Sequence, residues 1–363
     1  MSKLKIVLAG GGTSGHRLPV LTVYHELAKL ADVQGWYFGT AKDVESPEIQ
    51  SSGLKTVTIT SGKLRRYLSW ENLTDLGKVW RGWRVARAEL EAIKPDVVFV
   101  KGGYVSVPVA LAAKRLGIPV VTHESDAVLG LANKIISRAA EAVAVTFPVE
   151  MYPKRWRRKM HHTGPIMRPE LIGHGWQSSA KPKQIMILGG SQGSRRINQL
   201  VWEMLPKITK EVRVYHQTGP NDLETAQQHK KDLPEKQAKS YLPVGYIAGG
   251  DKLVNQILKS EIVISRSGST IFELALLGVP SILIPLSTSA GGHQAQNARH
   301  FADRRAALVL DETTLTADEL LTQIKRLLNI RSRRDKLSAA MRELAVADGA
   351  AQVAALILAH ANR

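Results

Sequence analysis

Residues 6–16 read IVLAGGGTSGH, and residues 185–194 read IMILGGSQGS. Each stretch is an apolar run followed by a glycine-rich turn, and each turn leads into residues with helical periodicity. The unpaired N–H groups at the start of a helix, together with the helix dipole, make such a turn an anion site. Because the two stretches begin roughly 180 residues apart, they predict a two-domain nucleotide-handling enzyme with its active site in the cleft between the domains.

Strand-like apolar runs alternate with helix-like segments on both sides of a basic segment rich in Gly, Pro and Ser, residues 152–183. This alternation predicts a doubly wound parallel α/β sheet in each half. The expected strands are residues 5–8, 35–38, 56–60, 96–100, 119–122 and 142–145, then 184–188, 213–217, 262–265, 281–285 and 307–310. We expect an N-terminal domain over residues 1–163, a C-terminal domain over residues 164–348, and a terminal helix over residues 349–363 that packs back on the first domain.

Bulk composition narrows the class of protein. The chain has 363 residues, 44% of them hydrophobic, and no cysteine, which excludes disulfide and thiolate chemistry. The formal charge of +18 predicts an anionic partner: nucleic acid, anionic lipid or a phosphorylated substrate. We expect no signal peptide, and no apolar run reaches the roughly 18 residues of a spanning helix.

Polar clusters follow several predicted strands, at the edge where open α/β sheets bind ligands. They begin at Lys101, His123, Arg266 and His293. A dinucleotide site at the first turn is disfavoured, because Gly39 and Thr40 stand where an acid would hold the ribose. This turn is not a phosphate-binding loop of the NTPase kind either, because no Gly-Lys-Ser/Thr follows it. No D-x-D run or zinc-binding histidine spacing occurs, so we expect no required metal and no cofactor.

Seven motifs in one order are similar to those of a known family. They are GGTSGH at 11–16, GGYVS at 102–106, HESD at 123–126 with GLANK at 130–134, GPIMR at 164–168, GGSQG at 189–193, SRSG at 265–268, and HQ at 293–294 with NA at 297–298. The ordered set resembles the peptidoglycan N-acetylglucosaminyltransferases of glycosyltransferase family 28. The resemblance implies a GT-B fold and inverting, metal-independent transfer of GlcNAc from UDP-GlcNAc to the MurNAc 4-hydroxyl of lipid I (undecaprenyl-pyrophosphoryl-MurNAc-pentapeptide), which forms lipid II in peptidoglycan synthesis.

Other functions stay open at this point. The same fold could serve a transferase acting on another lipid acceptor, or an enzyme similar to the UDP-GlcNAc epimerases. A basic nucleic-acid-binding protein would have the charge, but it leaves the polar clusters at the strand ends unexplained, and no nucleic-acid motif is present. We therefore expect no nucleic-acid partner.

Two residues are candidates for the catalytic base. An imidazole has an unperturbed pKa near neutral pH, and His16 ends the first glycine turn, so His16 is a base or a brace for that turn. Asp126 follows a predicted strand and is either the rival base or the cap of the next helix.

The resemblance also implies a set of substrate-binding residues. Ser191, Gln192 and Gly193 would hold the donor diphosphate, with Thr13, Ser14 and Gly15 completing the site from the other domain. Glu273 would accept hydrogen bonds from the ribose hydroxyls, and Gln294 with His293 would read the sugar. The remaining expected contacts are Asp126, Arg168, Ile247, Gly268, Ser269 and Thr270.

The chain departs from the family pattern at four places. Ser14 replaces the usual Gly, and Gly291-Gly292 stands where an acid is more usual. The segment from Arg266 to Glu273 is one residue shorter, and the loop at 246–255 is expanded.

Clusters that mix cations with aromatics predict contact with an anionic membrane surface. They are residues 63–67 with Trp70, residues 80–84 and residues 155–159. We expect the loop at 64–70 to touch lipid, and Leu73, Leu76, Trp80 and Trp83 to be the inward stripe of a helix. The expected location is peripheral, on the cytoplasmic side of the inner (plasma) membrane.

Overall fold

The computed structural model describes residues 3–11, 14–62, 71–181, 183–247 and 249–361, and for residues 14–16 and 71–76 it describes the backbone alone. The chain divides into two compact units. Unit 1 comprises residues 1–168 and 347–363, and unit 2 comprises residues 169–346.

Unit 1 is built on a parallel sheet whose strands, among the described residues, lie in the order β3-β2-β1-β4-β5-β6-β7. The strands are β1 (Leu4–Ala9), β2 (Val33–Gly39), β3 (Lys55–Thr58), β4 (Val97–Val100), β5 (Val120–Glu124), β6 (Ala142–Val145) and β7 (Met160–His162). The helices are α1 (Ser14–Leu30), α2 (Ala41–Val44), α3 (Pro47–Gln50), α4 (Glu71–Ile93), α5 (Ser106–Arg115), α6 (Leu131–Ala139) and α7 (Lys154–Arg157). The order reverses between β1 and β4, which defines the switch point of a doubly wound sheet.

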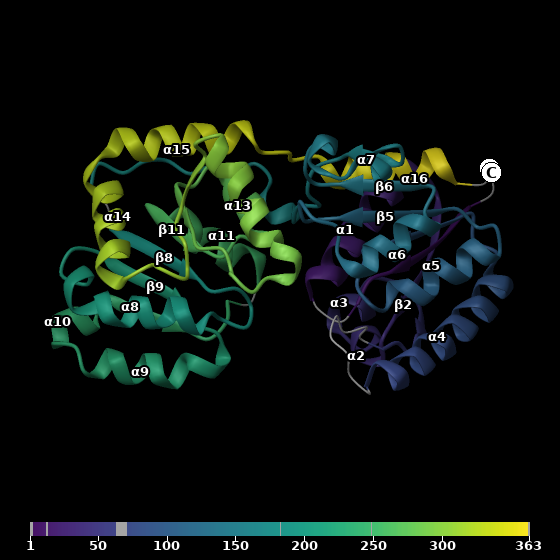
Figure 1. Cartoon of the computed structure of the whole chain (residues 1–363), viewed down its shortest axis with the longest axis horizontal. Helices are drawn as coiled ribbons and strands as arrows, with labels where there is room; N and C mark the ends of the chain where they lie inside the picture. The colour runs from purple at the N-terminus through teal and green to yellow at the C-terminus, as the bar shows by residue number, and fades with distance from the viewer. Residues whose placement is uncertain (1–2, 12–13, 63–70, 182, 248, 362–363) are drawn as a thin grey trace. The chain divides into compact units, whose positions relative to one another are not determined.

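The last helix of the chain, α16 (Gly349–His360), belongs to unit 1 and packs on α1. In Figure 1 it is the yellow helix among the purple and blue elements of unit 1. Val353, Ala354 and Ile357 carry its apolar face into the buried cluster of this unit. Their i, i+1, i+4 spacing is that of one helix face.

Unit 2 repeats the arrangement in the order β10-β9-β8-β11-β12-β13, again with parallel pairing. Its strands are β8 (Gln184–Leu188), β9 (Arg213–Gln217), β10 (Tyr241–Val244), β11 (Ile262–Ser265), β12 (Ser281–Leu283) and β13 (Ala307–Val309). Its helices are α8 (Arg195–Ile208), α9 (Leu223–Lys231), α10 (Glu235–Ala238), α11 (Gly250–Leu258), α12 (Thr270–Leu277), α13 (His293–Asp303), α14 (Ala317–Asn329) and α15 (Arg331–Glu343). The switch point lies between β8 and β11.

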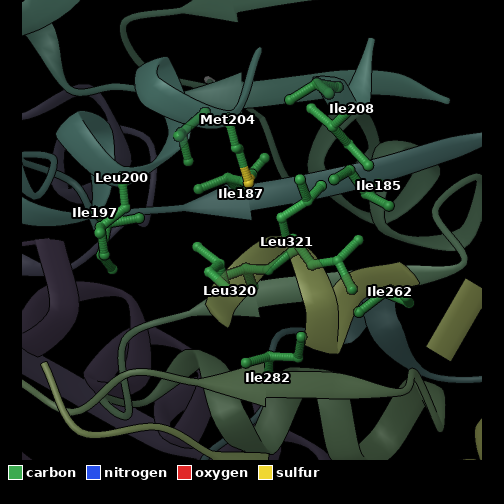
Figure 2. Packing of buried hydrophobic residues seen from close by; sticks show 14 of the residues in the cluster. Ile185, Ile187, Ile197, Leu200, Met204, Ile208, Ile262, Ile282, Leu320 and Leu321 are labelled. Carbon is green, nitrogen blue, oxygen red and sulfur yellow. The ribbon is translucent and has the colours of Figure 1, made fainter. Parts of the chain in front are cut away.

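The core of unit 2 fills the space between this sheet and the helices α8 and α14, which pack against each other (Figure 2). Ile197, Leu200 and Met204 of α8 follow the helical period and are fully buried. They meet the alternate residues Ile185 and Ile187 of β8. This face fixes α8, and hence the glycine turn that precedes it, against the sheet.

The structure confirms the predicted doubly wound sheets and differs in two strands. β7 and β10 lie at sheet edges and escape the sequence pattern. β7 is a three-residue strand containing His161 and His162, so it offers no apolar run. β10 contains Pro243, which argues against a central strand but is tolerated on an edge strand.

α1 begins at Ser14, and Pro19 lies inside the helix. One prediction about a helix is wrong. In α4, Trp80 is 57% exposed and does not point inward. The buried face of α4 is instead formed by Gly82, Ala86 and Leu90. At Gly82 the helix lies close to the chain at Thr60, since a Cβ there would lie 2.0 Å from the Thr60 carbonyl oxygen. The side chains of Leu73 and Leu76 lie outside the described residues.

No helix within the described ranges is long and apolar enough to cross a membrane.

Candidate functional site

The glycine turn after β8 lies at the switch point of unit 2, where open sheets bind their ligands. Gly190 and Gly193 both have positive φ, and the Gly193 N–H donates to the Gly190 carbonyl at 3.0 Å. Ser194 caps α8 by accepting a hydrogen bond from the Ile197 N–H. Ser191 and Gln192 are exposed on this turn, in front of the N-terminus of α8. The arrangement presents backbone N–H groups and a helix dipole to an anion.

The backbone of this turn lies in close contact with the backbone of the segment that follows β9. A Cβ at Gly193 would lie 1.9 Å from the Thr218 carbonyl oxygen, and one at Gly219 would lie 2.3 Å from that of Gln192. Only glycine fits at either position, since both also have positive φ. The shape of the turn therefore depends on where β9 ends.

A buried polar network holds the end of β9 in place. Asn198 of α8 donates to the Thr218 carbonyl at 2.9 Å and to Asp222 at 2.7 Å. Its carboxamide oxygen lies 3.0 Å from His216 Nε2, and His216 Nδ1 lies 3.0 Å from the Tyr241 hydroxyl. Burial lowers the pKa of His216 to about 3, so the ring is neutral and can both donate and accept in this network.

The second element at this edge of unit 2 is the N-terminus of α12, on the other side of the switch point. Ser269 is exposed there, Thr270 and Glu273 are half-buried, and the space around Gly268 is open. Glu273 stands in the first turn of the helix. A carboxylate at this position is favoured by the helix dipole, and its oxygens can accept hydrogen bonds.

Arg266 holds the loops of this edge together from behind. Its guanidinium donates to the Ile284 carbonyl at 3.0 Å and to the Ser194 hydroxyl at 2.6 Å, and it pairs with Glu312. Burial raises the pKa of Glu312, but hydrogen bonds from Arg266 and Ser287 outweigh it and keep this pKa below its usual value. In the sequence Arg266 belongs to a motif without a role of its own, and in the structure it braces the α8 cap.

His293 and Gln294 begin α13, which follows two glycines in the left-handed region. Gly291 and Gly292 have φ of 69° and 66°, a conformation that disfavours the acid more usual in the family. Gln294 Oε1 accepts from the Leu286 N–H at 2.9 Å, which directs its amide nitrogen to other partners. His293 Nδ1 lies 2.9 Å from the Ala290 carbonyl oxygen.

Ile247 stands on the connection between β10 and α11 and is buried, while its neighbour Tyr246 is 53% exposed. Its backbone N–H donates to Gln217 Oε1 at 3.3 Å. Gln217 was absent from the predicted site, because it is a single polar residue at the end of a predicted strand and belongs to none of the motifs.

In unit 1 the first glycine turn lies at the matching switch point, after β1. Thr13 lies outside the described residues, and Ser14, Gly15 and His16 begin α1. Next to this turn Asp43 is buried, forms an ion pair with Arg17 at 3.0 Å, and would lie 2.2 Å from a Cβ at Gly11. No motif in the sequence marks Asp43, because it belongs to α2, four residues beyond the end of β2.

Charged side chains gather at the ends of β4 and β5. Lys101 is 5% exposed and donates to the Ser125 hydroxyl at 2.6 Å. Burial lowers the pKa of Lys101 to about 8, although the nearby charges of Glu124 and Asp126 oppose this shift. The backbone N–H of Lys101 pairs with Ala9 at 2.9 Å, which ties the cluster to the end of β1.

Glu124 organises the loop that carries Asp126. Its carboxylate accepts from the backbone N–H groups of Asp126 at 3.1 Å and Gly130 at 3.0 Å, and from Asn133 Nδ2 at 2.9 Å. Burial and the neighbouring Asp126 raise the pKa of Glu124. Hydrogen bonds to its main chain therefore fix the position of the half-buried Asp126. The Tyr152 hydroxyl adds another by donating to the main-chain carbonyl of Asp126 at 2.9 Å.

The predicted site residues thus fall into two groups. Ser191, Gln192, Gly193, Ile247, Gly268, Ser269, Thr270, Glu273, His293 and Gln294 lie at or beyond the carboxyl ends of the strands of unit 2. Asp126 and the backbone of Ser14, Gly15 and His16 lie at the same edge of unit 1, and Arg168 is the last residue before unit 2 begins. Within the described part of the chain, no cluster of His, Cys, Asp and Glu could hold a metal ion.

Comparison with known proteins places both units in one family. Residues 6–145 match the glycosyltransferase family 28 N-terminal domain, and residues 184–353 match its C-terminal domain. A protein of Clostridium perfringens strain SM101 is 39% identical over 90% of this chain and 91% of its own length. One of Staphylococcus aureus strain MRSA252 is 36% identical over 91% and 92%. Both are named UDP-N-acetylglucosamine--N-acetylmuramyl-(pentapeptide) pyrophosphoryl-undecaprenol N-acetylglucosamine transferase.

Solved structures agree with this assignment. MurG of Acinetobacter baumannii is similar with a TM-score of 0.77 and 26% identity, over 98% of this chain and 99% of that one. A UDP-GlcNAc 2-epimerase from Neisseria meningitidis has a TM-score of 0.68 at 15% identity, over 98% of this chain and 100% of that one, and shares the fold alone. The chain belongs to glycosyltransferase family 28, and its two doubly wound units are those of the GT-B fold.

Proposed function

We propose that this enzyme transfers GlcNAc from UDP-GlcNAc to the MurNAc 4-hydroxyl of lipid I and forms lipid II. The observation that carries the proposal is the pair of helix N-termini, α8 and α12, on either side of the switch point of unit 2. They suit a nucleoside diphosphate, and the two relatives above are named for this donor and acceptor.

Unit 2 then holds the donor. The turn at Ser191, Gln192 and Gly193 binds the diphosphate, while the loop at Ile247 holds the uracil. Glu273 accepts hydrogen bonds from the ribose hydroxyls. Gly268, Ser269 and Thr270 offer further N–H groups to the phosphates, and His293 and Gln294 contact the sugar. Arg168, the last residue before unit 2 begins, is a further proposed contact of the nucleotide.

Unit 1 binds the acceptor and supplies the base. In the inverting step the acceptor 4-oxygen attacks the anomeric carbon, the bond from that carbon to UDP breaks, and the hydroxyl proton passes to His16 or Asp126. Thr13, Ser14 and Gly15 add backbone donors near the reacting groups. The departing diphosphate is stabilised by N–H groups and helix dipoles, each charge-assisted hydrogen bond contributing about 1.5–3 kcal/mol.

A labelled-donor assay tests this proposal. The full-length enzyme is incubated with labelled UDP-GlcNAc in EDTA, with and without a lipid I analogue. We expect GlcNAc incorporation only when the acceptor is present. Release of label without acceptor would indicate an epimerase-like or hydrolytic enzyme, and incorporation that disappears in EDTA would contradict transfer without a metal.

We also propose that the protein works peripherally on the anionic cytoplasmic face of the inner membrane, where a lipid-linked acceptor would be found. Trp80 on α4 supports this placement, since the Arg84 guanidinium lies 5.0 Å from its ring centre and both are exposed. Exposed Trp paired with Arg suits a lipid headgroup layer. The loop at 64–70, which was predicted to touch lipid, lies outside the described residues.

Sedimentation with vesicles tests the membrane surface. Binding to vesicles with anionic lipid should weaken several-fold in Trp80→Ala, because an interfacial aromatic is lost, while transfer to a water-soluble acceptor analogue stays unchanged. Unchanged vesicle binding in this variant would remove α4 from the membrane surface.

A further inference from the structure

The end of β9 lies between two loops. The proposed function assigns the diphosphate of the donor to one of them and the uracil to the other. The sheet order β10-β9-β8 puts β9 in the middle, so the turn after β8 and the loop after β10 flank its last residue, Gln217. Gln217 pairs with Leu188 in the sheet and is only 5% exposed. A carboxamide buried at this depth requires hydrogen-bond partners for both its oxygen and its nitrogen.

Gln217 finds one partner in each loop. Its Nε2 donates to the Gly190 carbonyl at 2.9 Å, and its Oε1 accepts from the Ile247 N–H at 3.3 Å. No charged group is involved in either bond. A single neutral side chain thereby connects the turn proposed for the diphosphate to the loop proposed for the uracil.

The bond to Gly190 also sets the direction of an N–H group on the turn. In a trans peptide the N–H of one residue points opposite to the carbonyl of the residue before it. Because the Gly190 carbonyl accepts from both Gln217 and Gly193, it is held toward the interior. The Ser191 N–H is therefore directed away from Gln217, on the exposed side of the turn.

We infer that Gln217 is a positioning residue that couples the diphosphate turn to the uracil loop, so that one UDP moiety fits both at once. This inference rests on the proposed function, because it takes the assignment of the two loops from it. The carboxamide keeps the loops at a fixed separation before the donor arrives, so less conformational freedom is lost on binding.

Two substitutions separate the two bonds. Gln217→Glu keeps an oxygen for the Ile247 N–H, loses the donor to the Gly190 carbonyl, and places a carboxylate oxygen against that carbonyl. Gln217→Met keeps the length of the side chain and loses both bonds. Gln227→Glu, on the exposed face of α9, makes the same charge change away from this edge and serves as the control.

The experiment measures the affinity of each full-length variant for UDP and for uridine, together with KM for UDP-GlcNAc and for the lipid I analogue. Gln217→Glu should weaken UDP binding and raise the donor KM by about ten-fold or more, because the Gly190 carbonyl loses one of its two donors and faces a carboxylate oxygen instead. Its uridine affinity and acceptor KM should stay within about two-fold of those of the unaltered enzyme, as should all values for Gln227→Glu. Gln217→Met should weaken the binding of both uridine and UDP.

Two results would overturn the inference. UDP affinity unchanged in either Gln217 variant would show that the carboxamide does not position the turn. Equal losses for UDP and uridine in Gln217→Glu would show a general structural role without coupling. Failure of the proposed function is distinct, since it would appear as an unaltered enzyme that transfers no GlcNAc from UDP-GlcNAc.

Discussion

The carboxyl edges of the two sheets have the same topology but different chemistry. In unit 2 the edge is held by neutral carboxamides, Gln217, Asn198 and Gln294, and its buried ion pair of Arg266 with Glu312 lies behind the loops. In unit 1 charged groups stand at the edge itself: Lys101 and Glu124 are buried there, and Asp43 pairs with Arg17 beside the glycine turn.

The difference follows the work proposed for each edge. An edge that must hold a diphosphate benefits from backbone N–H groups that keep a fixed orientation, and neutral side chains fix them without competing for the anion. An edge that must take a proton from a hydroxyl benefits from groups whose pKa is shifted by burial and by neighbouring charges. The comparison predicts that changes in unit 1 alter turnover, while changes in unit 2 alter donor binding.

The largest effect should come from removing the base. His16→Ala and Asp126→Asn each test one candidate, and loss of a general base lowers turnover by about 100- to 10,000-fold. The variant that lacks the true base should show this loss with UDP affinity unchanged. Single-turnover rates with saturating donor measure it. Near-normal turnover in either variant would exclude that residue as the base.

The next effect concerns the glycine turn of unit 2. Gly193→Ala forces a Cβ against the Thr218 carbonyl at positive φ, which should cost more than about 2 kcal/mol and weaken UDP binding more than about 30-fold. Gly190→Ala has the same backbone strain but open space around its Cβ, so its loss should be smaller. Titration of UDP into both variants compares them. A Gly190→Ala loss as large as that of Gly193→Ala would mean that contact with β9 does not shape the turn.

The network behind that turn predicts a pH dependence of stability. His216 has a folded pKa of about 3 against about 6.5 unfolded, so between these values the unfolded chain binds the extra proton and folding weakens as the pH falls. The contribution lost between pH 7.5 and pH 5 is roughly 2 kcal/mol. Burial also lowers the pKa of His123 in unit 1, so this residue too weakens folding as the pH falls.

Urea unfolding at the two pH values measures this loss. His216→Gln should be less stable at pH 7.5 and should lose less stability on going to pH 5. An equal loss in the variant and in the unaltered protein would remove His216 as a source of the acid sensitivity.

The smallest effect on the fold should come from Lys101→Met. Because burial already disfavours the charged form of Lys101, an apolar side chain of similar length should leave the thermal midpoint within a few degrees. It removes a positive charge near Glu124 and Asp126, so the acid limb of the rate profile should move to higher pH. Rates from pH 5 to pH 9 measure this shift. An unchanged profile with normal turnover would separate Lys101 from the chemistry.

Much of this architecture could be predicted from the sequence, because the buried parallel strands are apolar runs and the turns at both switch points are marked by glycine. The site was harder to predict where contacts cross between elements. Gln217 and Asp43 act on loops far from them in sequence, and no local pattern announces such a partner. β10 was missed for a related reason, since its Pro243 is permitted only by its place at the edge of the sheet.

Amide hydrogen exchange of the full-length enzyme with and without UDP-GlcNAc tests whether unit 2 holds the donor. We expect the donor to slow exchange in peptides that contain residues 189–194, 245–250 and 267–273, and to leave peptides around residues 101–106 and 123–130 unchanged. Protection confined to the unit 1 peptides, with none in the turn at residues 189–194, would contradict the account.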